Sequence, residues 1–471
     1  MDNSISMFNR QIYTVLGAAR SGLAVARLLS EEGESVFVSD AKRGDESLQS
    51  VEVLEALDIP YEFGGHSERV LEADVIILSP GIPPNIPILL EAEKRGIRVT
   101  NEIEIASRYC RGRIIGITGT NGKTTTTELI GHICRTAGRK TLVAGNVGIP
   151  FSEVTRQATA DSLVVLELSS FQLEKIESFH PDVALLLNVT PDHLDRYESI
   201  EEYGAAKLRI TMNQTEGDRL IYNGDNQWLR RIGQMDFRPK MLSYSLLHDV
   251  EAGAFLRDGN LMIQTDESEE AVAVIPAQEI GIRGPHNLAN SMGAALAALS
   301  VGIPVGKIRE GLASFRPLPH RLEEVAQING VRYINDSKGT NTDALRYALE
   351  SFDSPIILIA GGRAKKNRYD ALLSLVEERV KAAVLIGEAA EEMEREFTGL
   401  TTIVMAGTSM ESALQKASEL AEPGDVVLLS PACASFDMFR NFEERGEVFR
   451  KIVESRAEGQ ESGVGTREAG I

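Results

Sequence analysis

The sequence predicts an α/β protein with three domains built on mainly parallel sheets. The chain has 471 residues, and domains usually contain about 100–200, so the length fits three of them. Short apolar runs of the kind that form buried parallel strands recur along the chain, with helical patterns between them. Several of these runs end in turns of Gly, Ser, Asn or Asp, as expected at the edge where α/β sheets bind ligands.

The composition disfavours some classes of binding partner and is compatible with others. Hydrophobic residues make up 43% of the chain and charged residues 25%, which is typical of a globular protein with several cores. The formal net charge is -20, whereas binding to nucleic acid or to an anionic membrane needs a broad basic surface. We therefore expect no nucleic-acid partner. A small anionic substrate is compatible with this charge, because it needs only a few local cations or backbone N–H groups.

The chain has three cysteines, Cys110, Cys134 and Cys433, and no CxxC or Cys/His cluster. We expect neither a disulfide framework nor a zinc site from this odd number. The start of the chain lacks the apolar centre of a signal peptide, and no run of 18 apolar residues suggests membrane insertion. A cytoplasmic protein is therefore expected. The sequence carries no direct signal of oligomeric state, and a monomer is the expectation.

The first domain is expected at residues 1–110. An apolar run at 12–16 is followed by a glycine turn at 17–22 and a helical pattern, and a second apolar run ends at Asp40. This strand–helix–strand order, with a turn able to receive phosphate, is typical of Rossmann-like domains. Ala19, however, stands where a dinucleotide fingerprint has a Gly that lets the backbone approach a pyrophosphate. A nucleotide or nucleotide-sugar site and simple helix–strand packing both remain open here.

The second domain is expected at residues 111–317 and carries the sharpest motif. Residues 116–125 read Gly-Ile-Thr-Gly-Thr-Asn-Gly-Lys-Thr-Thr and lie between an apolar strand and a helix. Small residues let backbone N–H groups converge on phosphate oxygens, and the helix N-terminus adds a positive dipole end. Lys123 can reach the β- and γ-phosphates, and the Thr124 hydroxyl can bind Mg²⁺. These features predict a P-loop ATPase-like domain with a mainly parallel sheet.

The spacing of this motif departs from the standard P-loop. Gly119 lies three positions before Gly122, whereas four residues separate the two glycines of the standard motif. The alternative is a plain glycine turn followed by a chance Lys-Thr pair. The strand–loop–helix context favours phosphate binding over that alternative.

Three further residues of the second domain are candidates for metal or phosphate chemistry. Glu167 follows the apolar run 163–166, where a carboxylate can bind Mg²⁺ beside a phosphate loop. His193 follows another apolar run, and Lys207 lies in a helical pattern. A lone His or a helix Lys is more often structural than functional, so residue type and spacing leave these two roles open.

The third domain is expected at residues 318–456 as a second Rossmann-like α/β unit, followed by a disordered tail at 457–471. Its strand candidates are the apolar runs 331–335, 356–360, 382–386 and 426–430. Polar clusters end three of these runs, at 335–341, 361–366 and 430–437. The carboxyl ends of parallel strands meet at one edge of a sheet, so we expect the clusters to lie together. A small substrate with two carboxylates would suit that surface.

Taken together, these motifs resemble the Mur ligase family, which also includes folylpolyglutamate synthases. The resemblance covers nearly the whole chain up to the tail. The Gly-Thr-Asn-Gly-Lys-Thr-Thr loop and the Asn-Asp-Ser-Lys cluster are typical of the family. Leu-Ser-Pro-Ala-Cys-Ala-Ser at 429–435, with Asn441-Phe442-Glu443-Glu444-Arg445-Gly446, resembles the members that add D-glutamate.

The resemblance implies an ATP-dependent ligase that adds D-glutamate to UDP-N-acetylmuramoyl-L-alanine in peptidoglycan synthesis, and so serves cell-wall biogenesis, cell shape and cell division. ATP would phosphorylate the terminal carboxylate, and the D-glutamate amine would attack the acyl phosphate, releasing phosphate. Several anions meet in such a reaction, and the resemblance implies ATP and two Mg²⁺ ions as cofactors. Lys207 matches a lysine that the family carbamylates, which turns a cation into a carboxylate-like metal ligand.

The resemblance also implies site residues, which fall into five groups. The catalytic group is Lys123, Glu167, His193 and Lys207, and the metal group is Thr124, Glu167, His193 and Lys207. The ATP group is Gly119, Thr120, Asn121, Gly122, Lys123, Thr124, Thr125, Asn287, Arg321 and Asp336. The UDP-substrate group is Arg20, Ser21, Asp40, Lys42, Ser79, Gly81 and Asn146, although Lys42 stands where the family often has Arg. The D-glutamate group is Lys338, Thr340, Lys365, Ser435 and Phe442.

Two other functional classes remain open. A nucleotide-hydrolysing switch would use the phosphate loop alone and would not need paired substrate sites in the first and third domains. A dehydrogenase would bind NAD(P)H at the first strand–helix–strand unit, and Ala19 counts against that binding. Within the family, the open choice is the acceptor amino acid.

Overall fold

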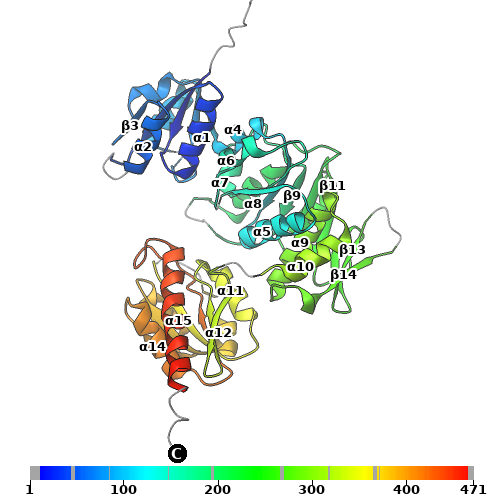
Figure 1. Ribbon diagram of the computed structural model, residues 1–471, viewed down its shortest axis with the longest axis vertical. Helices are drawn as coiled ribbons and strands as arrows, with labels where there is room; N and C mark the ends of the chain where they lie inside the picture. Colours follow the sequence, from blue (N-terminus) through cyan, green and yellow to red (C-terminus); the bar gives the residue numbers. More distant parts are fainter. Residues whose placement is uncertain are drawn as a thin grey trace, which may run out of the picture. The chain divides into compact units, whose positions relative to one another are not determined.

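The computed structural model shows three α/β sheets (Figure 1). The described residues are 11–43, 48–83, 85–146, 148–192, 196–265, 270–316, 319–363, 369–370 and 372–464. The chain divides into two compact units. The first comprises Met1–Ala277 with Ala289–Ala313, and the second comprises Gln278–Leu288 with Ser314–Ile471. The first two sheets lie in the first unit, and the third sheet lies in the second.

The first sheet has five parallel strands in the order β3-β2-β1-β4-β5. They are β1 (Ile12–Leu16), β2 (Ser35–Asp40), β3 (Tyr61–Phe63), β4 (Val75–Leu78) and β5 (Arg98–Asn101). The helices are α1 (Arg20–Glu31), α2 (Leu48–Ala56) and α3 (Pro87–Lys94). Val15 and Ile77 enter one buried cluster, whereas their neighbours Leu16 and Ile76 enter another. Both faces of the sheet are therefore covered, as is usual for parallel strands.

The second sheet has nine strands in the order β14-β13-β12-β11-β10-β9-β6-β8-β7. They are β6 (Arg113–Thr118), β7 (Thr141–Gly145), β8 (Leu163–Glu167), β9 (Val183–Leu186), β10 (Arg219–Asn223), β11 (Lys240–Ser245), β12 (Gly253–Arg257), β13 (Asn260–Gln264) and β14 (Val272–Pro276). The pairs from β7 to β12 are parallel, and β13 is antiparallel to both of its neighbours. Strand β6 therefore lies between β8 and β9, away from both edges of the sheet.

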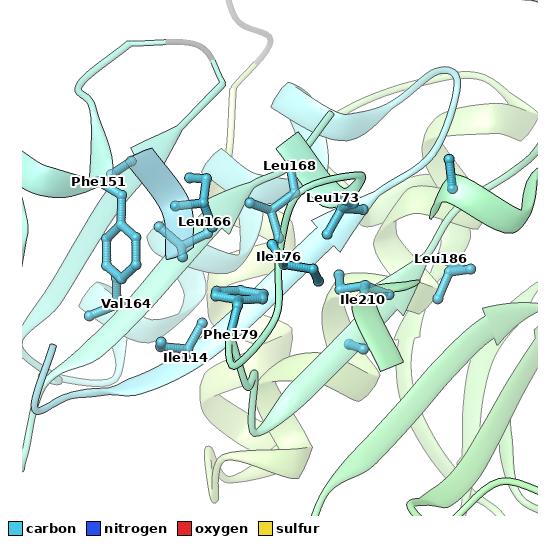
Figure 2. Close-up of a cluster of buried hydrophobic side chains, with 14 of the residues drawn as sticks. Ile114, Phe151, Val164, Leu166, Leu168, Leu173, Ile176, Phe179, Leu186 and Ile210 are labelled. Atoms are coloured by element: carbon cyan, nitrogen blue, oxygen red, sulfur yellow. The ribbon is translucent and has the colours of Figure 1, made fainter. Parts of the chain in front are cut away.

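Helices surround this second sheet and join it to the first. They are α4 (Glu102–Tyr109), α5 (Lys123–Thr136), α6 (Phe151–Val154), α7 (Ser170–Leu173), α8 (Ile200–Leu208), α9 (Pro285–Ser300) and α10 (Val305–Ser314). Figure 2 shows part of the core on one face, where Ile114, Leu166 and Phe179 contribute to one buried cluster. In the described part of the chain, no helix is both long and apolar enough to cross a membrane.

The third sheet has six strands in the order β15-β16-β20-β17-β18-β19, and only β15 is antiparallel to its neighbour. The strands are β15 (Glu323–Ile328), β16 (Val331–Asn335), β17 (Ile356–Gly361), β18 (Val380–Ile386), β19 (Thr402–Met405) and β20 (Val426–Leu429). The helices are α11 (Thr342–Glu350), α12 (Leu373–Arg379), α13 (Ala390–Phe397), α14 (Met410–Leu420) and α15 (Phe442–Val464). Leu358 and Ile359 of β17 enter different buried clusters, so both faces of this sheet are covered as well.

The predicted fold class, three α/β domains with mainly parallel sheets, is confirmed. Two features differ from the prediction. The antiparallel pairs of β13 with β12 and β14 were not predicted, and β13 and β14 are only partly buried. Helix α15 extends to Val464, into the stretch 457–471 that was predicted as a tail.

Within the first unit, the carboxylate of Glu104 ties α4 to the loop that follows α7. The side chain is fully buried, and its oxygens accept hydrogen bonds from the backbone N–H groups of Glu177, Ser178 and Phe179 at 2.9–3.1 Å. Burial alone would raise the pKa of Glu104, but these hydrogen bonds, with that of the Ser178 hydroxyl, lower it. The ionised carboxylate therefore stabilises the fold.

The contribution of Glu104 can be tested with the variant Glu104→Gln. An amide turns N–H donors toward backbone N–H groups, so we expect the free energy of unfolding to fall by about 1.5–3 kcal/mol at neutral pH. The lowered pKa means that this contribution is present above the ordinary glutamate pKa of about 4.3 and is lost as the pH falls through the native value. Urea unfolding measures the difference, with exposed Glu93→Gln as control. Equal stability of Glu104→Gln and wild type at pH 7 would contradict this account.

Candidate functional site

The phosphate loop connects β6 to α5 and holds a backbone conformation that needs glycine. Gly122 is the N-cap of α5, with φ of 83°. A Cβ atom at this position would lie 2.6 Å from the Asn290 side-chain oxygen. The Asn188 side-chain oxygen accepts hydrogen bonds from the backbone N–H groups of Thr120 and Asn121 at 3.1 and 2.8 Å. The loop is therefore fixed from the end of β9 and from α9.

Two lysines converge on the carbonyl oxygen of one loop residue. The Nζ atoms of Lys123 and Lys207 each donate to the Gly119 oxygen at 2.9 Å. Lys207 is 1% exposed, and its ammonium lies 4.2 Å from the centre of the Tyr203 ring. Burial, and then the charge of Lys123, hold the pKa of Lys207 well below its ordinary value. A polyanion bound here would relieve the repulsion between the two cations.

Oxygen donors lie beside these lysines. Glu167 ends β8 and is 3% exposed, and its Oε1 atom accepts a hydrogen bond from the Asn146 amide at 3.0 Å. Thr124 lies in the first turn of α5, and the buried Thr118 hydroxyl has no hydrogen-bond partner among the described residues. This donor set fits Mg²⁺, which prefers oxygen and keeps several ligand positions for phosphate and water. His193 lies outside the described residues.

Cysteine and histidine metal chemistry receives no support from the described part of the chain. No group of three or more His, Cys, Asp or Glu side chains is placed there to hold a metal ion.

The predicted loop residues are brought together in the loop and the first turn of α5: Gly119, Thr120, Asn121, Gly122, Lys123, Thr124 and Thr125.

The predicted UDP-substrate residues of the first domain lie at the carboxyl ends of three adjacent strands. Arg20 and Ser21 begin α1 after β1. Asp40 ends β2 and Lys42 follows it, while Ser79 and Gly81 follow β4. The Asp40 carboxylate accepts hydrogen bonds from the backbone N–H groups of Ala18 and Lys42 at 2.7 and 2.8 Å. Asp40 therefore shapes the glycine turn, while the side chains of Arg20 and Lys42 remain exposed. Asn146 lies apart from this group in sequence, after β7 of the second sheet.

A small cavity of about 20 Å³ joins the end of β4 to the second sheet within the first unit. Ser79, Phe171 and Arg196 are among its lining residues. The Arg196 guanidinium lies 4.1 Å from the centre of the Phe171 ring and pairs with Glu174 at 2.6 Å. No sequence pattern pointed to Phe171 or Arg196, because only the tertiary structure brings them close to Ser79.

In the second unit, polar clusters follow β16, β17 and β20, which are neighbours in the third sheet. The structure places four predicted D-glutamate residues in or after these clusters: Lys338, Thr340, Ser435 and Phe442. The Lys338 ammonium lies 5.1 Å from the centre of the Phe442 ring. Lys365 lies outside the described residues. The expectation that the clusters meet at one edge therefore agrees with the strand order.

Three predicted ATP residues, Asn287, Arg321 and Asp336, belong to the second unit, whereas the phosphate loop belongs to the first. Burial raises the pKa of Asp336 to about 7, and its carboxylate accepts a hydrogen bond from the Ser430 hydroxyl at 2.8 Å. The Asn287 amide donates to the Arg283 oxygen at 2.8 Å.

His286, next to Asn287, is a residue of this region that the sequence did not single out. Its ring lies 5.3 Å from that of Tyr347. Burial, and then the charges of Arg321 and Arg346, lower the pKa of His286 to about 4. The imidazole is therefore neutral at neutral pH and presents an aromatic surface.

Comparison with protein families gives three matches along the chain. The MurD N-terminal domain matches residues 14–88, the Mur ligase middle domain matches 117–298, and the Mur ligase, glutamate ligase domain matches 320–433. The matches contain the first glycine turn, residues 117–125 of the phosphate-loop motif and the clusters at 335–341 and 361–366, and the last match ends within the cluster at 430–437.

Curated relatives match at substantial identity. The UDP-N-acetylmuramoylalanine--D-glutamate ligase of Salinibacter ruber is 46% identical over 453 residues, which cover 94% of this chain and 97% of that protein. The enzyme of the same name from Geotalea uraniireducens is 44% identical over 457 residues, covering 97% of this chain and 99% of that protein.

Solved structures share the fold at low identity. MurF from Acinetobacter baumannii has a TM-score of 0.62 and 16% identity, covering 93% of each chain. A pseudomurein peptide ligase type C from Methanothermus fervidus has a TM-score of 0.59 and 20% identity, covering 95% of this chain and 100% of that one. At these identities the likeness concerns the fold alone.

The variant Gly122→Ala tests the phosphate loop. The added methyl group meets the Asn290 side chain, and the backbone must keep a φ of 83°. We expect affinity for ATP, measured by titration calorimetry, to fall about tenfold or more, since tenfold corresponds to only about 1.4 kcal/mol.

Gly138→Ala is the matched control for that variant. Gly138 follows the end of the same helix with φ of 75°, and a Cβ atom there meets nothing within 4 Å. It carries a similar backbone strain, of about 1–2 kcal/mol, away from the loop. Equal ATP affinity of the two variants would contradict the role given to the loop.

Proposed function

The chain belongs to the Mur ligase family, and on that premise we propose that it joins D-glutamate to UDP-N-acetylmuramoyl-L-alanine with ATP as the energy source. The observation that carries this proposal is the 46% identity, over 94% of the chain, with a relative that bears the name of this activity. The reaction forms an amide bond and releases ADP and phosphate. It belongs to peptidoglycan precursor synthesis, and we place it in the cytoplasm, where ATP and nucleotide sugars are available.

The phosphate loop would hold ATP. Backbone N–H groups of the loop and the N-terminus of α5 would receive the phosphates. The Lys123 ammonium would leave the Gly119 and Thr120 oxygens, to which it now donates at 2.9 and 2.8 Å, and would neutralise the transferred phosphoryl group. Thr124 and Glu167 would hold Mg²⁺, which stabilises the charge that develops on the phosphoryl oxygens.

The acceptor carboxylate and the γ-phosphate are both anions, so their approach needs positive charge from the protein. Transfer of the phosphoryl group to the terminal carboxylate gives an acyl phosphate. The neutral amine of D-glutamate would then attack the carbonyl carbon and form the C–N bond. The nitrogen would lose a proton, and phosphate would leave with the electron pair of the broken C–O bond. Fixed cations at the strand ends reduce the reorganisation that these steps require.

We also propose that Lys207 becomes carbamylated and helps to hold a second Mg²⁺. A neutral amine attacks CO₂, forms an N–C bond and loses a proton, which leaves a carboxylate-like group. The 1% exposure of Lys207 and its lowered pKa support this step, because they increase the fraction of neutral amine. The new negative charge would also remove the repulsion with Lys123. Glu167 lies at the end of β8, which pairs with β6, and would be a second protein ligand of this Mg²⁺ ion.

The remaining residue assignments are also proposals, and they follow the resemblance to the family. Asn287, Arg321 and Asp336 would contact ATP, and His286 would offer its neutral ring beside them. Arg20, Ser21, Asp40, Lys42, Ser79, Gly81 and Asn146 would contact the UDP-substrate. Lys338, Thr340, Lys365, Ser435 and Phe442 would contact D-glutamate, and His193 would lie near the metal.

Phosphate release from ATP tests the proposed function directly. We expect release only when UDP-N-acetylmuramoyl-L-alanine and D-glutamate are both present, with L-glutamate, other amino acids and folates inactive. Omission of each substrate in turn is the control. Release with another acceptor would replace the proposed substrate, and release with no acceptor would favour a nucleotide-hydrolysing switch.

The variant Lys207→Ala tests the carbamate. We expect activity to fall by about two orders of magnitude or more, the scale of one preorganised electrostatic contribution at a reacting centre. Formate or acetate should restore part of it, because either can enter the space left by the side chain and supply the carboxylate. The exposed Lys240→Ala serves as the control variant and should keep full activity. Restoration by methylammonium, and not by formate or acetate, would show that Lys207 acts as a cation and would exclude the carbamate.

A further inference from the structure

Arg445, near the start of α15, is a fully buried arginine bound to two separate loops. Its Nε atom donates to the Ser337 hydroxyl at 3.0 Å, and one terminal nitrogen donates to the Ser337 carbonyl oxygen at 2.7 Å. Both terminal nitrogens donate to the Cys433 carbonyl oxygen at 3.2 Å. One guanidinium therefore links the turn after β16 to the segment after β20.

A third loop lies against the same guanidinium. A Cβ atom built on Gly362, just after β17, would lie 3.2 Å from a terminal nitrogen of Arg445. The next residue, Arg363, donates its backbone N–H to the Ala434 oxygen at 2.9 Å. Strands β16, β20 and β17 are adjacent in the sheet, so Arg445 lies where all three strand-end clusters meet.

Burying the charge of the Arg445 guanidinium lowers the free energy of unfolding. Among the described residues it forms no ion pair, and every acceptor of its hydrogen bonds is neutral. Burial lowers the pKa of Arg445 to about 10, so the group is still a cation at neutral pH. Burying a charge costs several kcal/mol, and the attraction of the Asp437 and Asp336 carboxylates offsets only part of the effect of burial on the pKa of Arg445. A packing role alone would therefore not require arginine.

The residues that Arg445 holds lead directly to the proposed D-glutamate contacts. Ser337 precedes Lys338, and the Ser337 hydroxyl also donates to the Phe442 oxygen at 2.8 Å. Cys433 lies two residues before Ser435, which is 2% exposed. A planar guanidinium can bind both loops at fixed angles, which the single ammonium of lysine cannot do.

We propose that Arg445 is a positioning residue for the amino-acid site. It fixes the turn that carries Lys338 against the segment that carries Ser435, and so sets the distance between groups that receive a dicarboxylic amino acid. This inference rests on the proposed function, because it assumes that the strand ends of the third sheet receive the amino acid. Arg445 itself is enclosed by the loops and acts through them.

Steady-state kinetics of Arg445→Met and Arg445→Lys test this proposal. Arg445→Met keeps an unbranched apolar stem but removes the guanidinium, and Arg445→Lys keeps the positive charge without the planar set of N–H donors. We expect both to raise the KM for D-glutamate about tenfold or more, equivalent to about 1.4 kcal/mol. The KM for UDP-N-acetylmuramoyl-L-alanine should stay unchanged, because its proposed contacts lie in the first unit.

Arg456→Met is the matched control. Arg456 is also on α15 and donates to the Leu414 oxygen and the Ser418 hydroxyl of α14, at 3.1 and 2.9 Å. The Arg456→Met variant loses two hydrogen bonds from a partly buried arginine of the same helix, and it should leave the KM for D-glutamate unchanged. Ser337→Ala leaves Arg445 in place and removes the hydroxyl that accepts from Arg445 and donates to the Phe442 oxygen. It should raise the same KM by a smaller factor, and it covers the case in which Arg445→Met does not fold.

Two results would overturn the positioning role. The first is an unchanged KM for D-glutamate in Arg445→Lys and Ser337→Ala, whatever their melting temperatures. The second is an equal rise in KM for all substrates, which would indicate a general loss of structure. Failure of the proposed function is distinguishable from both, because wild-type protein would then release no phosphate in response to D-glutamate.

Discussion

The hydrogen-bond ladder of a parallel sheet stops at the carboxyl ends of its strands, and each sheet of this protein carries its proposed binding residues there. Backbone groups that leave the ladder still need partners, because an unpaired buried N–H or C=O is costly. Each edge has a polar side chain that supplies such partners. Asp40 binds the N–H groups of two turns in the first sheet, Asn188 binds the phosphate loop in the second, and Arg445 binds two loops in the third. The loops are therefore fixed without extra secondary structure, and the site residues that they carry are fixed with them.

The acidic character of the chain does not conflict with anionic substrates, because the relevant charge is local. A net charge of -20 is spread over a surface where salt screens it within about 8–10 Å. Lys123 and Lys207, by contrast, share the Gly119 oxygen at the end of a central strand. Cations held close together in a partly desolvated place attract phosphate more strongly than scattered surface lysines do. Composition thus excluded nucleic acid as an expected partner without excluding a nucleotide.

The sequence predicted those parts of the structure that depend on residues close together along the chain. Apolar runs such as those of β6 and β17 are buried on both faces, so they read as continuous hydrophobic segments. The phosphate loop is equally local, because its glycines, its lysine and its helix follow one another. Strands β13 and β14 are only partly buried and were missed, as were the links made by Asn188 and Arg445. Asn188 binds the loop across 67 positions, and Arg445 binds Ser337 across 108. No local pattern can specify such partners.

Lys207 and Arg445 show how one environment leads to two kinds of chemistry. Both are buried cations, and the carbonyl oxygens of other loops are among the acceptors of their hydrogen bonds. Desolvation opposes the charged form of each, but an amine gives up its proton far more readily than a guanidinium does. The pKa of Lys207 therefore falls well below its usual range, which supports a reactive neutral amine. The pKa of Arg445 falls only to about 10, so its charge and its planar fork persist. A buried lysine thus suits a position where a new group is to be attached, and a buried arginine suits one where loops must stay in place.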